Sequence, residues 1–141
     1  MDLVDKLVNR LTVIPHIKLG EKNNAIFIQK WLEKTTLLES LVLCSFQEEL
    51  IDFSKLKPIP SVKKLEMDLL EASYDLLKEI SRVFPCIEVF KSYNTMKNVG
   101  DFIKLIKEGK WPNLRKVTQT NSSCGDELRK YRPYLTCTQK N

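Results

Sequence analysis

Few residues in this 141-residue chain have the types and spacing that catalysis requires. The single histidine, His16, would need a nucleophile beside it, and the sequence contains no Gly-x-Ser-x-Gly turn that could hold one. Two pairs of carboxylates, Glu48 with Glu49 and Asp68 with Glu71, could exchange protons, but nothing in the flanking sequence is expected to perturb a carboxyl pKa. We therefore expect a surface histidine, solvated carboxylates and no catalytic residue, so the chain is predicted not to be an enzyme.

The cysteines and glycines give no sign of a metal or cofactor site. The four cysteines are far apart and none belongs to a Cys-x-x-Cys pair, which argues against a zinc site and a dense disulfide framework. Cys44 and Cys86 lie in apolar strings, which predicts buried thiols in a reducing compartment and hence a cytoplasmic or nuclear protein. The 4 glycines are too few for a dinucleotide-binding or Walker-type phosphate loop. No metal and no cofactor are therefore expected.

The composition favours one folded domain with a mildly basic surface. The 43% hydrophobic and 29% charged content is ordinary for a globular protein, and the length allows a single domain over 1–141. The net charge of +5 arises from 23 basic residues interleaved with 18 acidic ones, without a dense basic run. No apolar run approaches the ~20 residues of a membrane-spanning helix, and the amino terminus is not a signal peptide.

A repeated segment organises most of the chain. Five copies of the pattern aliphatic-x-x-aliphatic-x-aliphatic, with slips in the later copies, begin at Ile14, Leu38, Val62, Ile87 and Leu114. Successive copies start 24 to 27 residues apart. Short strand-like segments at such a period, separated by longer helical ones, are typical of a leucine-rich-repeat solenoid.

The sequence between the copies is helical at three places. Residues 23–34, 71–84 and 98–110 have apolar residues at helical spacing, and Gly109 is placed to end the third helix. The stretch between the second and third copies, 45–61, is too short and interrupted for a helix and predicts a loop or a 3₁₀ turn. Phe84 and Trp111, each followed by a proline, are expected to fill the gap between the helix and strand layers.

Both ends of the chain are expected to cover the ends of the repeat array. Residues 1–12 have helical spacing and predict an amino-terminal capping helix. Residues 121–141 predict a carboxy-terminal cap or tail, with a short helix before Pro133 that covers the exposed edge of the last strand.

The quoted segments also carry a family resemblance. "LLESLVL", "PSVKKLEM", "FPCIEVF" and "WPNLRKV" resemble the leucine-rich repeats of the ribonuclease-inhibitor-like superfamily, in the irregular form found in F-box proteins, and the last is similar to that family's "pNLrkLxL" strand. The resemblance implies an α/β solenoid of about five irregular repeats, with parallel strands on the concave face and helices on the convex face. It also implies a protein-interaction function, in its most specific form substrate recognition for an F-box-type ubiquitin ligase.

The concave face is the candidate binding surface. Because side chains alternate along a strand, two columns of residues should point away from the helices. The first column is His16, Ser40, Lys64, Val89 and Lys116, and the second is Lys18, Val42, Glu66, Lys91 and Thr118. We expect a protein partner of acidic tendency to contact Lys64, Glu66, Lys91, Tyr93 and Lys116. The simpler alternative is that these residues only form the solvated side of a sheet.

A second functional class follows from the basic excess, namely a nucleic-acid or phosphate-binding module. Ionic strength distinguishes the two classes in a binding assay. Binding to phosphates should weaken steeply between low and high salt because each contact releases counterions, whereas a largely apolar protein interface should respond much less.

Overall fold

The computed structural model describes residues 3, 6, 14–19, 25–43, 51–67, 73–92, 99–120 and 125–140. These residues form one six-stranded sheet in which every neighbouring pair is parallel and the strands lie in chain order. The strands are β1 (His16–Leu19), β2 (Ser40–Leu43), β3 (Lys64–Met67), β4 (Val89–Ser92), β5 (Lys116–Thr120) and β6 (Thr136–Lys140). The prediction of an α/β fold with parallel strands and alternating helices is confirmed, but the strands number six where five were expected.

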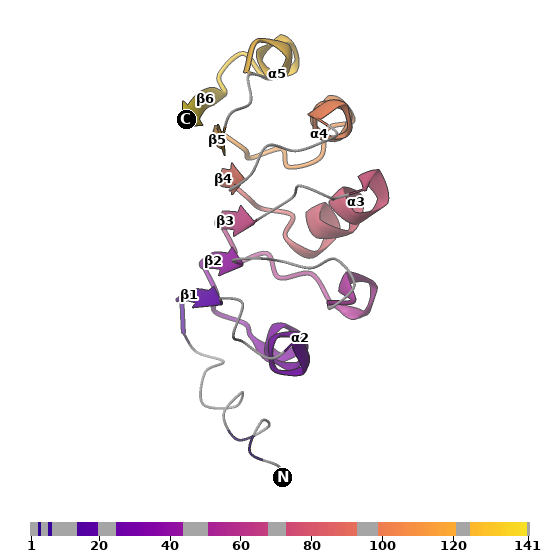
Figure 1. The fold of residues 1–141 in the computed structure, drawn as a ribbon, viewed down its shortest axis with the longest axis vertical. Helices are drawn as coiled ribbons and strands as arrows, with labels where there is room; N and C mark the ends of the chain where they lie inside the picture. Colours follow the sequence, from indigo (N-terminus) through magenta and orange to yellow (C-terminus); the bar gives the residue numbers. More distant parts are fainter. Residues whose placement is uncertain are drawn as a thin grey trace.

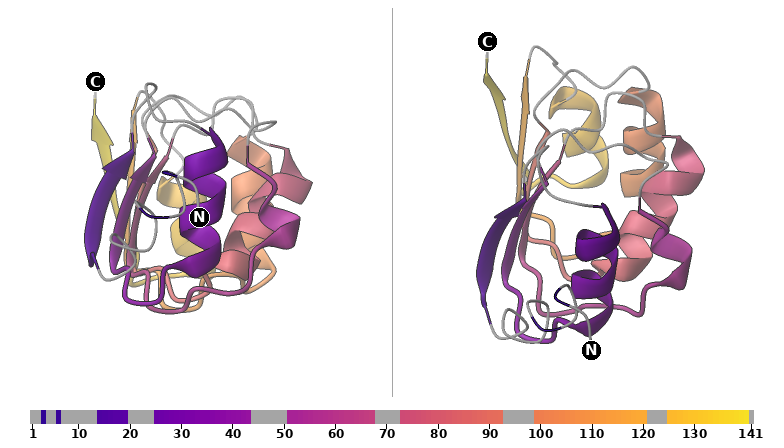
Figure 2. Two further views of the ribbon diagram at one scale, coloured as in Figure 1. Left: turned by 90° about the horizontal axis from the view of Figure 1, so that it is seen from below. Right: turned by 60° about the horizontal axis from the view of Figure 1, so that its bottom comes forward.

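A helical element lies between every two consecutive strands, and these elements form a second layer. They are α2 (Ala25–Lys34), the 3₁₀ turn η2 (Phe53–Lys55), α3 (Tyr74–Val83), α4 (Val99–Lys107) and α5 (Gly125–Tyr131). All of them lie on the same side of the sheet, so none of the described helices covers its other face, called here the outer face (Figure 2). The line of strands bows toward the helices, which makes the outer face concave (Figure 1).

All five strand pairs share one register, which aligns the residues in rows across the sheet. The first outer row is His16, Ser40, Lys64, Val89, Lys116 and Thr136, and the second outer row is Lys18, Val42, Glu66, Lys91, Thr118 and Thr138. Between them runs a core row of Ile17, Leu41, Leu65, Phe90, Val117 and Cys137, which packs in the hydrophobic core. The two columns predicted from alternation therefore correspond to the two outer rows.

The register is set where each strand begins. The carbonyl of the residue before one strand accepts N–H bonds from the start of the next: Glu39 accepts from Lys63 and Lys64, and Glu88 accepts from Arg115 and Lys116. Pro15 and Lys63 accept pairs of N–H bonds in the same way at the other junctions between β1 and β5, whereas at the last junction Arg115 accepts a single bond, from the Thr136 amide. A slip by one residue would turn the core row to solvent, so the apolar pattern and these hydrogen bonds favour the same alignment.

The core lies between the two layers and is rich in aromatic residues. Phe90 of the core row stacks on Phe102 of α4, with ring centroids 5.5 Å apart, and Trp111 lies 5.2 Å from Phe90. Phe84 and Trp111 are almost completely buried, with 0% and 1% of their surfaces exposed. These two residues therefore fill the space between the layers, as their position before the prolines predicted.

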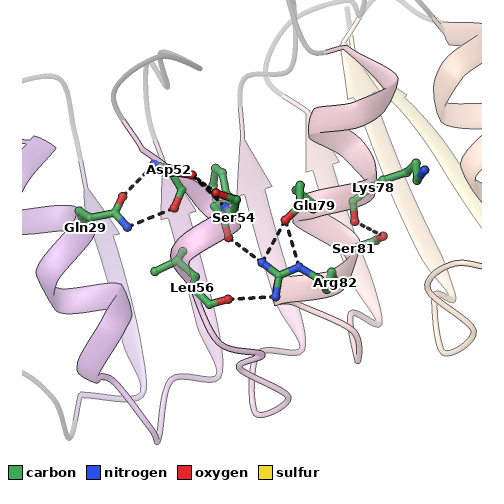
Figure 3. Close-up of polar contacts among 9 residues, drawn as sticks. Gln29, Asp52, Ser54, Leu56, Lys78, Glu79, Ser81 and Arg82 are labelled. Atoms are coloured by element: carbon green, nitrogen blue, oxygen red, sulfur yellow. Dashed lines mark hydrogen bonds and ion pairs between the residues drawn. The ribbon is translucent and has the colours of Figure 1, made fainter.

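The described part of the segment between β2 and β3, residues 51–63, forms the 3₁₀ turn η2 and no α-helix, and neighbouring helices hold it by side chain–backbone hydrogen bonds (Figure 3). Gln29 of α2 accepts from the Asp52 amide at 2.8 Å and donates to its carbonyl at 3.2 Å. On the other side, the Arg82 guanidinium of α3 donates to the carbonyls of Phe53 and Leu56, at 2.7 and 2.9 Å. Backbone groups that a helix would have paired internally are thus paired with the units on either side.

The turn η2 has its own cap. The Asp52 carboxylate accepts hydrogen bonds from the amide and the hydroxyl of Ser54. The bond from the Ser54 hydroxyl is the main cause of a pKa for Asp52 below its usual value. The capping aspartate keeps this short turn closed without a longer helix behind it.

The connection from α4 to β5 uses left-handed backbone twice. Gly109 (φ 84°) follows the helix, and the amides of Gly109 and Lys110 return to the carbonyls of Ile106 and Leu105, which closes α4 as predicted. Trp111 is also left-handed (φ 51°), a conformation that costs a non-glycine residue about 1–2 kcal/mol. Its indole N–H donates to the buried Phe84 carbonyl at 2.8 Å, and Arg132 donates to the carbonyls of Lys110 and Trp111.

The carboxy-terminal segment differs from the expected cap. The short helix before Pro133 is present as α5, but it packs beside α4 in the helix layer. The edge of β5 is covered by a sixth strand, β6, which was not expected. In β6 the first aliphatic position of the pattern is held by Tyr134, which is 96% exposed, while the neighbouring Leu135 is buried. Because this copy begins with a polar residue, the aliphatic pattern did not predict the strand.

The cysteines and the amino-terminal segment were also the subject of predictions. Cys86 is half-buried rather than buried, because it lies in the turn after Pro85, between the buried anchors Phe84 and Ile87. Cys44 lies outside the described residues. Of the predicted amino-terminal helix 1–12 the structure describes Leu3 and Lys6, both helical, and the remainder lies outside the described residues.

Trp111→Phe tests the buried indole hydrogen bond. The variant leaves the Phe84 carbonyl without this donor and opens a small cavity, so we expect the free energy of unfolding to fall by about 2–4 kcal/mol in urea denaturation. Tyr134→Phe also removes one polar hydrogen, from an exposed ring, and should change stability by less than about 0.5 kcal/mol. Equal stability of the two variants would contradict a stabilising role for the indole bond.

Arg82→Met tests the hydrogen bonds that join α3 to the segment around η2. The methionine keeps an apolar stem but leaves two carbonyls without their donor, so unfolding should become easier by about 1–3 kcal/mol. Arg115→Met is the matched control, because the Arg115 side chain is 63% exposed and lies 3.5 Å from Glu88, a surface pair worth under about 1 kcal/mol. If both variants lost the same stability, the carbonyl bonds would add nothing beyond a surface ion pair.

Candidate interaction surface on the sheet

The outer face of the sheet contains a hollow of about 420 Å³. Outward-facing residues of β2 to β6 line it, together with Leu65 of the core row and Arg115 just before β5. Its lining includes Lys64, Glu66, Val89, Lys91 and Lys116, which belong to the two outer rows. Residues far apart in sequence are therefore brought to one place by the shared register.

Positive charge predominates in the lining. The lining has four basic side chains, Lys64, Lys91, Arg115 and Lys116, and one acidic side chain, Glu66, which lies opposite Lys91 in the strand register. Lys64 and Lys116 are exposed, and no ion pair among the described residues holds either ammonium group. Lys91 and Glu66 are half-buried on neighbouring strands. This surface can attract an anionic group more readily than a cationic one.

The rest of the lining is uncharged, and apart from Leu65 its side chains are small. Val89 separates Lys64 from Lys116 in the first outer row, so an apolar side chain lies among the basic ones. Ser40, Thr118 and Thr138 supply hydroxyl groups that can donate or accept. Thr118 is buried, because its short side chain lies between its strand partners Lys91 and Thr138.

The residues just before the strands form a row of alternating charge at the entry edge of the sheet. The row reads Glu39, Lys63, Glu88 and Arg115. The Glu88 carboxylate lies 3.5 Å from Nε of Arg115, and His16 Nε2 lies 3.9 Å from Glu39. Opposite charges balance along this edge, so the excess positive charge of the hollow comes from its three lysines.

Most of the predicted site residues meet at the hollow. Lys64, Glu66, Lys91 and Lys116 all line it, while Tyr93 lies outside the described residues. Sequence reasoning did not include Arg115, although it stands next to Lys116 in "NLRKV".

Thr138 was also missed, because it belongs to the unexpected strand β6. The core residues of β5 and β6, Val117 and Cys137, are only 20 residues apart, which is shorter than the earlier period. Alternation in "LTCTQ" is the signal that could have found this strand.

The residues with other potential chemistry do not assemble into a site in the described part of the chain. His16 is exposed, as predicted, with 68% of its side chain accessible. Within the described ranges, no group of three or more His, Cys, Asp or Glu side chains could hold a metal ion. The carboxylate pairs Glu48–Glu49 and Asp68–Glu71 lie outside those ranges. No described helix is both long and apolar enough to cross a membrane.

Searches found no matching family model, no matching curated protein and no matching solved structure.

Proposed function

We propose that this chain is a short leucine-rich-repeat-like solenoid that acts as a non-enzymatic protein-interaction module through the outer face of its sheet. The repeated segments at 24 to 27 residues, the single register and the one-sided helix layer support the solenoid. Each unit contacts mainly its neighbours in chain order, as expected of a repeat array.

One observation carries the functional part of this proposal. The outer face is not covered by any described helix, and its hollow is lined largely by side chains that the core does not use. Solenoids use their curved faces as extended binding surfaces. A half-buried valine among lysines and hydroxyl groups has the mixed polarity that protein interfaces contain.

The most specific version of the proposal is substrate recognition for an F-box-type ubiquitin ligase, in the cytoplasm or nucleus. Its support is the resemblance of "WPNLRKV" and the related segments to the irregular repeats of F-box proteins. The alternative is a nucleic-acid or phosphate-binding module. The four basic side chains in the hollow favour that alternative, whereas Glu66 and the lack of an aromatic residue in the described lining weigh against it.

Val89→Trp tests whether the outer face binds a partner. The substitution fills the centre of the hollow without changing charge, so we expect proteins captured by the tagged chain from an extract of its own source to be lost. Cross-linking followed by mass spectrometry identifies the captured proteins and the contact residues. Recovery of cullin-ligase subunits would support the ligase version.

Thr36→Trp is the matched control, since it adds the same neutral bulk at an exposed position between α2 and β2, away from the hollow. Circular dichroism and thermal melting should show both variants folded. Capture of the same proteins by Val89→Trp as by the unchanged chain, or no specific capture at all, would overturn the proposal. Recovery of nucleic acid that leaves at modest salt would favour the alternative.

A further inference from the structure

We infer that the side of β6 that faces away from β5, called here the β6 edge, binds an extended segment of a partner protein, which extends the six-stranded sheet by one parallel strand. β6 lies at one end of the line of strands, and no described strand pairs with this side of it (Figure 1). The edge of a sheet presents backbone N–H and C=O groups on which a further strand can pair. The two edges of this sheet differ in their suitability for such pairing.

At the β1 edge the donor that the sheet uses elsewhere is absent. Within the sheet, the residue before a strand donates its N–H to the unit before it, as Glu39 and Arg115 do. The register places Pro15 at the equivalent position before β1, and proline has no N–H to donate. A proline at an edge position prevents a further strand from pairing in the same way. The β1 edge is therefore a poor site for strand addition.

At the β6 edge the corresponding acceptor is present. The carbonyl before one strand accepts N–H groups from the start of the next, and Leu135 has this place before β6. No backbone N–H in the described ranges donates to the Leu135 carbonyl. Because N–H groups alternate along a strand and the Thr136 amide points to β5, the Gln139 amide points to the β6 edge. β6 contains no proline, and its only charged residue is Lys140.

The core at this end needs little more than a strand to cover it. Leu128 of α5 and Leu135 are buried, although no described unit follows them. In the core row, by contrast, Cys137 is half-buried, whereas its strand partner Val117 is buried. An aliphatic residue of an added strand would lie beside Cys137 and cover its exposed part, and the residues on either side of it would lie in the outer rows and could be polar.

A separate protein fits the β6 edge better than a second copy of this chain. Strands β2 to β5 are paired on both sides, and β1 of a second copy would bring Pro15 to the donor position. A second copy of β6 would pair antiparallel about a two-fold axis, whereas all five strand pairs here are parallel. The occupant is therefore a partner segment in which an aliphatic residue lies between polar ones. Residues 113–119, Asn-Leu-Arg-Lys-Val-Thr-Gln, have this pattern and supply a soluble probe peptide.

The first test measures binding of this peptide to the full chain by fluorescence anisotropy. In β5 the Lys116 N–H points to β4, and by alternation so does that of Thr118, so in the peptide these two groups should pair with β6. N-methylation at both positions should weaken binding by at least about tenfold. N-methylation at Val117 and Gln119 is the matched control, because those N–H groups point away, and should cost less than about threefold. Equal losses, or no saturable binding, would overturn the proposal.

Gln139→Pro tests the edge from the side of the chain. It removes an N–H that points to the β6 edge but no hydrogen bond between β5 and β6, and its ring obstructs an added strand. The fold should be kept, and peptide binding should fall by at least about tenfold. Gln139→Ala keeps the N–H and should bind within about twofold of the unchanged chain. Equal binding by the two variants would overturn the proposal.

Thermal melting shows whether both Gln139 variants are folded. If Gln139→Pro did not fold, the N-methylated peptides would still decide between pairing through the backbone and binding through side chains alone.

Cross-linking tests the direction of the added strand. A photoreactive benzophenone on the first residue of the peptide should cross-link near Leu135, and cross-links near Lys140 instead would overturn the parallel pairing. Sedimentation velocity tests the occupant, and the chain alone should remain a monomer. Concentration-dependent dimers that Gln139→Pro abolishes would show that a second copy occupies the edge and would overturn the assignment to a separate partner.

The β6 edge can be distinguished from the hollow of the proposed function. Val89 lies in β4, two strands away from β6, so Val89→Trp should leave peptide binding within about twofold of the unchanged chain. Loss of peptide binding in a folded Val89→Trp variant would overturn the edge as the binding site. Capture of cellular proteins that Val89→Trp leaves unchanged and Gln139→Pro abolishes would overturn the proposed function and support the β6 edge.

Discussion

The outer face depends on the hydrogen bonds with which each strand begins. One carbonyl before a strand accepts two N–H groups from the start of the next at four of the five junctions, and one N–H group at the fifth. It places Lys64, Val89 and Lys116 in one row although they are separated by more than twenty residues each. Strand pairing thus positions the residues that line the hollow. Because the core row makes the buried contacts, the lining side chains can be substituted without disturbing the core.

The helix layer needs other means to stay in register, because its elements differ in length and the described residues between β2 and β3 form a 3₁₀ turn and no α-helix. Gln29 and Arg82 tie the segment around η2 to its neighbours, and Trp111 and Arg132 form similar bonds nearer the carboxy terminus. Most of these bonds join a side chain to a carbonyl that a regular helix or sheet would have paired. Units of different length therefore fit together because side chains of one unit form hydrogen bonds with backbone groups of its neighbour.

Local patterns were sufficient to predict much of this fold. The spacing of apolar residues identified α2, α3, α4 and five strands, and simple alternation gave both outer rows, since these depend on the period of each element alone. The strand β6 was missed because Tyr134 replaces an aliphatic residue and the step shortens. The bonds of Arg82 and Arg132 follow no local pattern, because they join side chains to carbonyls more than twenty residues away. Alternation predicts which face of the sheet a side chain points to, but it does not predict how far the side chain reaches. Arg115 was therefore not predicted to line the hollow.

The bonds of Arg82, Trp111 and Arg132 all run from a later unit to a carbonyl of the unit before it. The order of the units along the chain therefore matters to folding as well as to shape. The carbonyls of Phe53, Phe84 and Trp111 lack these donors until the following unit has formed, so during synthesis the units that contain them are completed only after the next has emerged. The array should accordingly gain its final stability from its carboxy-terminal end, and fraying of that end should loosen the units before it in turn.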